Sequence, residues 1–310
     1  MDELSSVVAT SDGGCLVTGI TSSTDLPGSS SSTDVLLAKI SGTGTLDWVA
    51  AIGTAESERG NTIIKTADGG FALTGYSGDH FLVVKLKASA EQSPDGMIDW
   101  QERYLVPGHK GCTGYSITQD GDALVIGGRA LGMDIARPGP LFGKLDVATG
   151  NLLTARVLEN HGDGLAFDIE TIGSGYVLAG RSGCEALVFS VDKNGNPGWV
   201  RTYGGAGCLD LFRSIVVTSD GYVLVGETNS KNGDIPGSKG GIDVWLMKIG
   251  NDGTRISSYT FGGKDDDKGD EVLTGSADSY MIVGSTRSKS GDVSGNKGLS
   301  DIWALEVKLP

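Results

Sequence analysis

The sequence predicts an all-β protein, a six-bladed β-propeller of four-stranded antiparallel blades. One block recurs six times, glycine supplies 50 of the 310 residues, and each block holds short apolar runs bounded by turn residues. A sheet with two apolar faces is stable only when neighbouring sheets cover both, as the blades of a propeller do. A solenoid would favour shorter repeats, and two β-sandwiches would not give six matching units.

Each block contains a tight turn between two apolar runs, and these turns mark the repeat. They are centred on Asp12, Asp68, Asp120, Ser174, Asp220 and Asp278. We place the repeats at approximately 1–56, 57–110, 111–162, 163–208, 209–266 and 267–310. The whole chain, 1–310, is thereby predicted to be a single propeller domain.

The fifth repeat shows the expected elements in order. Its four strands are predicted at 214–218, 222–227, 243–249 and 256–261. The first and last pairs are joined by tight turns at 219–221 and 251–253, where Asn and Gly tolerate positive φ. A long polar loop over 228–242 joins the second strand to the third. No segment has a sustained helical period with capping residues, so we expect almost no helix.

The last repeat departs from this pattern. It ends after its third strand, 301–308, and the first repeat starts directly with its own first strand at 4–10. We therefore expect a three-stranded last blade. The alternative is that the chain is part of something longer.

Composition argues against several functions. The formal net charge is −14, which repels phosphate and disfavours nucleic-acid binding. No apolar run approaches the ~20 residues of a membrane-spanning helix. The start, Met1 to Leu4, shows no signal peptide, which is expected to be absent or removed.

The repeats resemble a known family. The fifth contains SKNGDIPGSKGGIDVWLMKIGNDG, the sixth SKSGDVSGNKGLSDIWALEVK, and the fourth DKNGNPGWVRTYGGAGC. These segments resemble the Gly- and Asp-rich propeller repeats of the SBBP type in large bacterial cell-surface and secreted proteins. The resemblance covers the whole chain. It implies an extracellular or cell-surface, non-enzymatic propeller and brings no catalytic residues.

Paired aspartates recur around the loop between the second and third strands. They are Asp25 and Asp34, Asp234 and Asp243, and Asp292 and Asp301. Carboxylates and carbonyls suit Ca²⁺, so we predict that any calcium ion or partner binds near these six residues. The alternative is that each Asp accepts hydrogen bonds from its own loop. The sequence calls for no other cofactor.

Other polar residues give weaker signals. A second acidic position lies between repeats, at Glu58, Asp210 and 265–267, where we expect a solvated rim or attraction of cations. The three histidines lie in no zinc motif, and no catalytic residue stands out from the repeated background.

Cysteine spacing suggests one disulfide. Cys184 precedes the third strand of the fourth repeat, and Cys208 follows its fourth strand, so an antiparallel hairpin places them nearly opposite each other. Four reduced thiols are the alternative. Cys15 and Cys112 lie in repeats one and three, and we expect both to be free.

The functional hypotheses rest on the long loops between the second and third strands. Long ones are expected at 21–33, 129–141, 228–242 and 286–300, and those of repeats five, six and one would cluster if the ring closes. The leading hypothesis is an extracellular binding or scaffold module for a protein or glycan. The alternatives are a carbohydrate-active lyase or hydrolase with its site at the central channel, and a purely structural repeat of a surface filament or adhesin.

Overall fold

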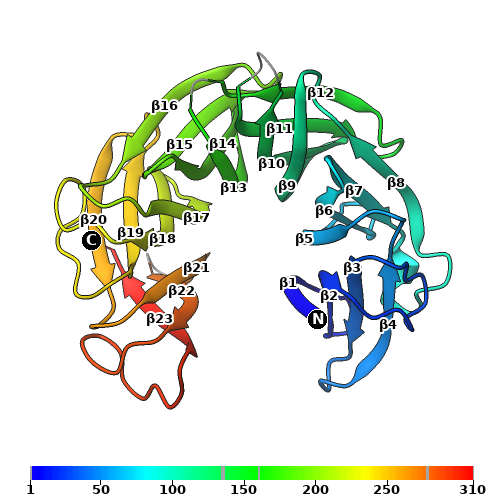
Figure 1. Cartoon of the computed structure of the whole chain (residues 1–310), viewed down its shortest axis with the longest axis horizontal. Coiled ribbons are helices and arrows are strands. Elements are labelled where there is room, and N and C mark those ends of the chain that lie inside the picture. Colours follow the sequence, from blue (N-terminus) through cyan, green and yellow to red (C-terminus); the bar gives the residue numbers. More distant parts are fainter. Residues whose placement is uncertain (1, 134–136, 160, 277–278, 310) are drawn as a thin grey trace. The chain divides into compact units, whose positions relative to one another are not determined.

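The computed structural model describes residues 2–133, 137–159, 161–276 and 279–309, and it shows an all-β chain with six β-propeller blades. Each of two compact units, 1–160 and 161–310, contains three blades. Figure 1 shows the strands of each blade side by side, and all neighbouring strands pair in antiparallel fashion. The predicted fold class is confirmed, including the three-stranded last blade. The prediction of one domain over 1–310 stays a prediction.

The first unit holds blades 1 to 3. Their strands are β1 (Asp2–Ala9), β2 (Cys15–Thr21), β3 (Asp34–Ile40) and β4 (Leu46–Ile52); β5 (Glu58–Lys65), β6 (Phe71–Ser77), β7 (His80–Leu86) and β8 (Ile98–Tyr104); and β9 (His109–Asp120), β10 (Ala123–Gly132), β11 (Gly139–Asp146) and β12 (Leu152–Val157). The helical part of the described residues is one 3-10 turn, η1 (Ala88–Glu91). None of their helices has the length and apolar character needed to cross a bilayer.

The second unit holds blades 4 to 6. Their strands are β13 (Leu165–Ile172), β14 (Gly175–Ser182), β15 (Glu185–Asp192) and β16 (Pro197–Tyr203); β17 (Asp210–Val217), β18 (Gly221–Thr228), β19 (Asp243–Gly250) and β20 (Arg255–Phe261); and β21 (Asp267–Thr274), β22 (Ser279–Thr286) and β23 (Asp301–Lys308).

A glycine near the end of each second strand makes room for a bulge in the first strand. In blade 5 the register shifts between Phe212 and Ser214, opposite Gly226. A Cβ at Gly226 would collide with the carbonyl oxygen of Leu211, so only glycine fits there. Equivalent glycines lie at 19, 75, 128, 180 and 284. The glycine that ends each second apolar run in the sequence is therefore a packing requirement.

Apolar side chains from successive blades form the cores within each unit. In unit 2 one cluster joins blades 4 and 5, and another joins blades 5 and 6. Trp245 of β19 is fully buried and stacks on Phe212 of β17, with ring centroids 4.5 Å apart. First strands of neighbouring blades also touch: the Ile215 amide donates to Asp168 Oδ2 at 2.9 Å.

Two predicted boundaries are wrong. The first strand of blade 5 begins at Asp210, not at residue 214, because its polar start pairs with the end of β18. In blade 3 the loop expected over 129–141 is largely strand: Arg129 pairs with Pro140 and Ala130 with Gly139. Residues 134–136 of that loop, and Asp278 of the last turn, lie outside the described residues.

A lysine, buried in blades 1 and 2 and half-buried in blade 5, connects the third strand to the first turn. Lys39 pairs with Asp12, Lys85 with Asp68, and Lys248 with Asp220, each at 2.8 Å. The side chain of Lys85 is only 2% exposed. Burial alone would raise the pKa of Asp68, but hydrogen bonds from Lys85, Thr66 and the Gly70 amide lower it to about 2. The turn aspartate is thus held ionised beside the ammonium group.

Removing the carboxylate from one such pair should destabilise the protein. Asp68→Asn leaves the Lys85 ammonium buried without its counter-charge, and we expect the free energy of unfolding at pH 7 to fall by about 2 kcal/mol. This is below the full buried-pair value because Asp68 is 59% exposed. The double variant Asp68→Asn/Lys85→Met should recover most of the loss in urea unfolding. Equal stability of wild type and Asp68→Asn would contradict the argument.

The same pair predicts a pH dependence. The folded-state pKa of Asp68 lies below its ordinary 3.8, so the stabilisation is present above that value and lost as the pH falls toward 2. The stabilities of wild type and Asp68→Asn should therefore converge in acid.

Candidate ligand-binding site

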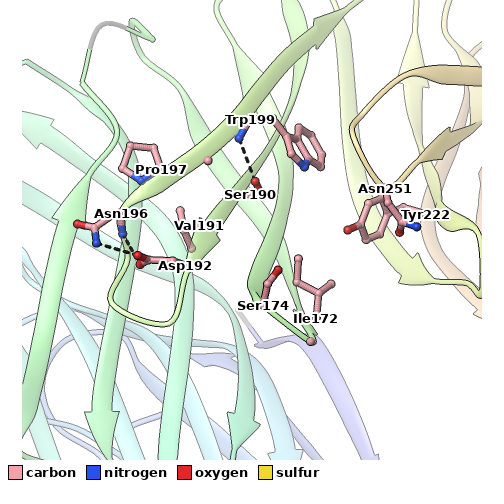
Figure 2. Close-up of a pocket in the computed structure, with 12 residues that line it drawn as sticks. Ile172, Ser174, Ser190, Val191, Asp192, Asn196, Pro197, Trp199, Tyr222 and Asn251 are labelled. Atoms are coloured by element: carbon pink, nitrogen blue, oxygen red, sulfur yellow. Dashed lines mark hydrogen bonds between the residues drawn. The ribbon is translucent and has the colours of Figure 1, made fainter.

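An open hollow lies between blades 4 and 5, at the end of the strands where the hairpin turns are. Its volume is about 600 Å³. Figure 2 shows side chains entering it from both blades, with Trp199 on β16 and Tyr222 at the start of β18. The lining comes from the turns between β13 and β14, β15 and β16, and β19 and β20, together with the strand residues beside them.

The aromatic part of this pocket is fixed by packing. The rings of Trp199 and Tyr222 lie 6.2 Å apart at 45°. Trp199 rests on Gly253 of the next hairpin, where a Cβ would meet the indole ring. Its amide donates to Ser190 Oγ at 3.1 Å (Figure 2). Tyr222 is buried, and burial raises the pKa of its phenol. The indole is thus held at the pocket by contacts to both blades.

The polar part of the pocket divides into two kinds of side chain. Asp192 accepts hydrogen bonds from the Asn196 amide and Asn196 Nδ2, at 2.9 and 2.8 Å (Figure 2). It also accepts the Asn194 amide at 2.8 Å, and so holds its own turn. Ser174 and Asn251 are exposed and hydrogen-bond to no other described residue through their side chains. These two offer a hydroxyl and an amide to a ligand.

The pocket chemistry favours binding over catalysis. Asp192 is the single carboxylate among its lining residues, and it is already committed to three donors. Aromatic rings next to amide and hydroxyl groups suit a neutral ligand that is apolar on one face and rich in hydroxyls at its edges.

Three of the six predicted aspartates hold their own loops together. Asp34, Asp243 and Asp301 each start a third strand, and each accepts a loop amide: Ser30, Lys239 and Lys297, at 2.7, 2.8 and 2.6 Å. Oδ1 of Asp243 is buried without a hydrogen-bond partner among the described residues. No group of three or more metal-ligating side chains occurs in the described part of the chain. The calcium prediction stays a prediction.

Two of the other aspartates connect neighbouring blades. Oδ2 of Asp234 accepts the Gly204 amide at 3.0 Å, and the Asp234 amide donates back to the Gly204 carbonyl. Asp292 makes the same pair of bonds with Gly262. Asp25, the equivalent residue of blade 1, is exposed and has no hydrogen-bond partner among the described residues. In unit 2 these loops lie at the strand ends opposite the pocket of Figure 2.

The expected solvated rim is wrong for three acidic residues. Glu58, Asp210 and Asp267 are buried at the starts of β5, β17 and β21. Asp210 accepts hydrogen bonds from the Gly205 amide, Thr228 Oγ1 and Ser230 Oγ at 2.5 to 3.0 Å. Asp267 and Glu58 are satisfied by the same kinds of donor. Burial is therefore tolerated because every carboxylate oxygen has donors.

The cysteines adopt the predicted pairing. The structure joins Cys184 and Cys208 as a disulfide, with Cα atoms 4.2 Å apart, across the end of the β15–β16 hairpin. Cys15 and Cys112 are free thiols, and burial raises the pKa of Cys112.

A second cluster of polar groups lies on the first strands of unit 2. Ser214 Oγ of β17 donates to Glu271 Oε1 of β21 at 3.2 Å, and Glu170 lies on β13. Burial, and then the negative charge of Asp168, raise the pKa values of Glu170 and Glu271 to about 7. Burial also raises the pKa of Asp270, against the influence of Arg213. Sequence analysis did not single out these carboxyls, because nothing in the repeat shows that the first strands β13, β17 and β21 pack in succession.

Comparisons with known proteins identify the fold and not the family. No protein-family profile and no curated protein sequence matches this chain. A neuraminidase-like protein of A/little yellow-shouldered bat/Guatemala/060/2010 superposes with a TM-score of 0.52 at 9% identity, covering 100% of this chain and 95% of that one. A proposed 6-phosphogluconolactonase of Bacteroides uniformis gives a TM-score of 0.56 at 12% identity, covering 97% and 88%.

Substitution can show whether the blade-connecting aspartates, Asp234 and Asp292, stabilise the fold or bind a ligand. We expect Asp234→Ala/Asp292→Ala to lower the free energy of unfolding by about 2 kcal/mol, because the Gly204 and Gly262 amides lose their carboxylate acceptors. The exposed ion pairs with Arg255 and Lys239 are lost as well and add little. The loss should be the same with and without a calcium chelator. Asp25→Ala, the matched control, should leave the melting temperature unchanged. If chelation instead lowers the melting temperature of the wild type to that of the double variant, these aspartates bind calcium.

Glu170 predicts a stability change at neutral pH. Its folded-state pKa lies above the ordinary 4.5, so ionising it costs the folded protein stability that is lost as the pH rises from 4.5 through about 7. Glu170→Gln should therefore raise the free energy of unfolding at pH 8 by on the order of 1 kcal/mol, after allowance for solvent screening. Near pH 4 the two proteins should be equally stable. We expect a smaller effect for Glu271→Gln, since that side chain is more exposed to water.

Proposed function

We propose that this chain is an extracellular binding module that holds a glycan in the pocket between blades 4 and 5. The observation that carries the proposal is the pocket itself, in which packing fixes Trp199. Beside it lie Ser174 and Asn251, two polar side chains that make no hydrogen bond to another described residue. A sugar ring presents an apolar face to an aromatic side chain and hydroxyls to amides, so this lining matches its chemistry.

An extracellular location is part of the proposal. The disulfide between Cys184 and Cys208 supports it, because such bonds persist in oxidising compartments. The acidic surface charge and the polar loops agree with a soluble partner rather than a nucleic acid. The known structures with this fold include a neuraminidase-like protein. At 9% identity that likeness concerns the fold and assigns no ligand to this chain.

The pocket can be tested with two substitutions that leave the fold alone. A glycan array on the purified chain selects the best-bound glycan, and calorimetric titration then compares wild type with Ser174→Ala/Asn251→Ala. Losing two hydrogen bonds of about 1 kcal/mol each should weaken binding roughly tenfold or more. The melting temperature should not change, and a chelator should not affect affinity.

The matched control is Ser219→Ala/Asn151→Ala. These residues are exposed in equivalent hairpin turns that do not line the pocket. Equal glycan affinity of the pocket variant and the control variant would show that the pocket is not the binding site.

A carbohydrate-active enzyme is the second candidate. One observation favours it: Glu170 and Glu271 have pKa values of about 7, the range in which a carboxyl serves as a general acid at neutral pH. If the bound glycan is cleaved, Glu170→Gln should abolish cleavage and retain binding, whereas the binding module alone cleaves nothing.

A further inference from the structure

A second hollow lies at the edge strand of blade 5. It is bounded by residues 233–236 of the loop before β19 and by residues 255–259 of β20, the fourth strand. Its volume is about 360 Å³. None of its lining residues belongs to the pocket between blades 4 and 5, so it is a separate site and does not depend on the glycan proposal.

The hollow exists because the loop of blade 5 stands away from its edge strand. In blade 1 the equivalent loop closes on β4: the Ala51 amide donates to the Pro27 carbonyl at 2.8 Å. A Cβ on Gly28 would lie only 2.2 Å from the carbonyl oxygen of Ala51. In blade 5 a Cβ on Gly237, the equivalent glycine, would meet nothing within 4 Å. Blade 5 therefore has space that blade 1 fills.

An ion pair lies in the wall of this hollow. Arg255 Nη1 and Asp234 Oδ1 are 3.1 Å apart, and the two side chains are 45% and 31% exposed. Asp234 Oδ2 accepts the Gly204 amide. A guanidinium group has five N–H donors and a carboxylate accepts about four hydrogen bonds, so each partner keeps capacity for a ligand.

The charges of this pair select a ligand that carries both signs. A bare carboxylate drawn to Arg255 would be repelled by Asp234, and a bare ammonium drawn to Asp234 would be repelled by Arg255. A ligand with both charges side by side pairs each with its opposite. The ammonium and carboxylate of a free α-amino acid have this arrangement, because one carbon atom joins them by bonds of about 1.5 Å.

Much of the remaining lining is apolar. Ile235 is buried, Pro236 follows it in the loop, and the Ile256 side chain is 55% exposed. Tyr259 also lines the hollow. Covering an exposed isoleucine is favourable in proportion to the apolar area removed from water. A ligand with an apolar side chain therefore gains more from this hollow than one without.

We propose that the hollow at the edge of blade 5 binds a free α-amino acid with an apolar side chain. Arg255 binds its carboxylate, Asp234 binds its ammonium group, and Ile256 contacts its side chain. A residue within a polypeptide does not carry both charges on one carbon atom. The ligand is therefore a small molecule and not a further segment of chain.

Leucine is the probe, and calorimetric titration of the full chain is the measurement. Leucine should bind saturably. Leucinamide, which lacks the carboxylate, and N-acetylleucine, which lacks the ammonium group, should each bind at least tenfold more weakly. Glycine, which carries both charges and no side chain, should also bind at least tenfold more weakly.

Substitutions locate the site. Arg255→Gln should weaken leucine binding at least tenfold without lowering the melting temperature, because an exposed ion pair contributes little to stability. Arg156→Gln is the matched control, since Arg156 is an exposed arginine on the fourth strand of blade 3 and lines neither pocket. This control and Ser174→Ala/Asn251→Ala should both bind leucine as the wild type does.

Each outcome decides the proposal. Saturable leucine binding that requires both charged groups of the ligand and Arg255 supports it. No saturable binding of leucine, equal binding of leucine and either blocked derivative, or wild-type affinity in Arg255→Gln overturns it. Loss of leucine binding in Ser174→Ala/Asn251→Ala, with Arg255→Gln unaffected, would place the amino acid in the other pocket and would also overturn it.

Discussion

Each blade is a sheet whose central strands are apolar on both faces, and the rest of the structure depends on covering those faces. In blades 1 to 5 the second and third strands are buried along most of their length, as in β18 and β19. Such strands cannot exist in an isolated sheet, because both faces must be removed from water. Packing one blade on the next satisfies this need and spreads the core over several clusters, each shared by two blades.

Apolar packing alone would let neighbouring blades slide, and polar contacts at the strand ends fix their positions. The carboxylate that starts a blade, such as Asp210 or Asp267, accepts amides from the end of the preceding blade and hydroxyls from its own second strand. The loop aspartates 234 and 292 add a reciprocal pair of bonds to Gly204 and Gly262. Directional bonds thus set the register that non-directional burial leaves open.

The sequence was sufficient to predict the blades because turns and bulges need particular residues. Glycines such as Gly226 sit where a side chain would strike the neighbouring backbone, so the repeat is visible in the chain itself. The buried acidic residues could not be predicted in the same way. Whether Asp210 faces water or a set of donors depends on Thr228 and Ser230, which are brought to it only by folding. The aligned hydroxyls at the ends of the second strands were the available signal.

The pocket was not predicted from the sequence for a related reason. Its position depends on which end of the strands carries the contacts between blades. At the loop end of unit 2, the conspicuous polar residues are engaged in holding blades together, which explains why they recur. At the hairpin end the turns need few such links, so Ser174 and Asn251 carry no structural bond among the described residues. Ligand-binding side chains can differ from blade to blade only where the fold does not require them. A search for regular features in the repeat therefore finds the contacts that hold the blades together, whereas the ligand site lies where the repeat is irregular.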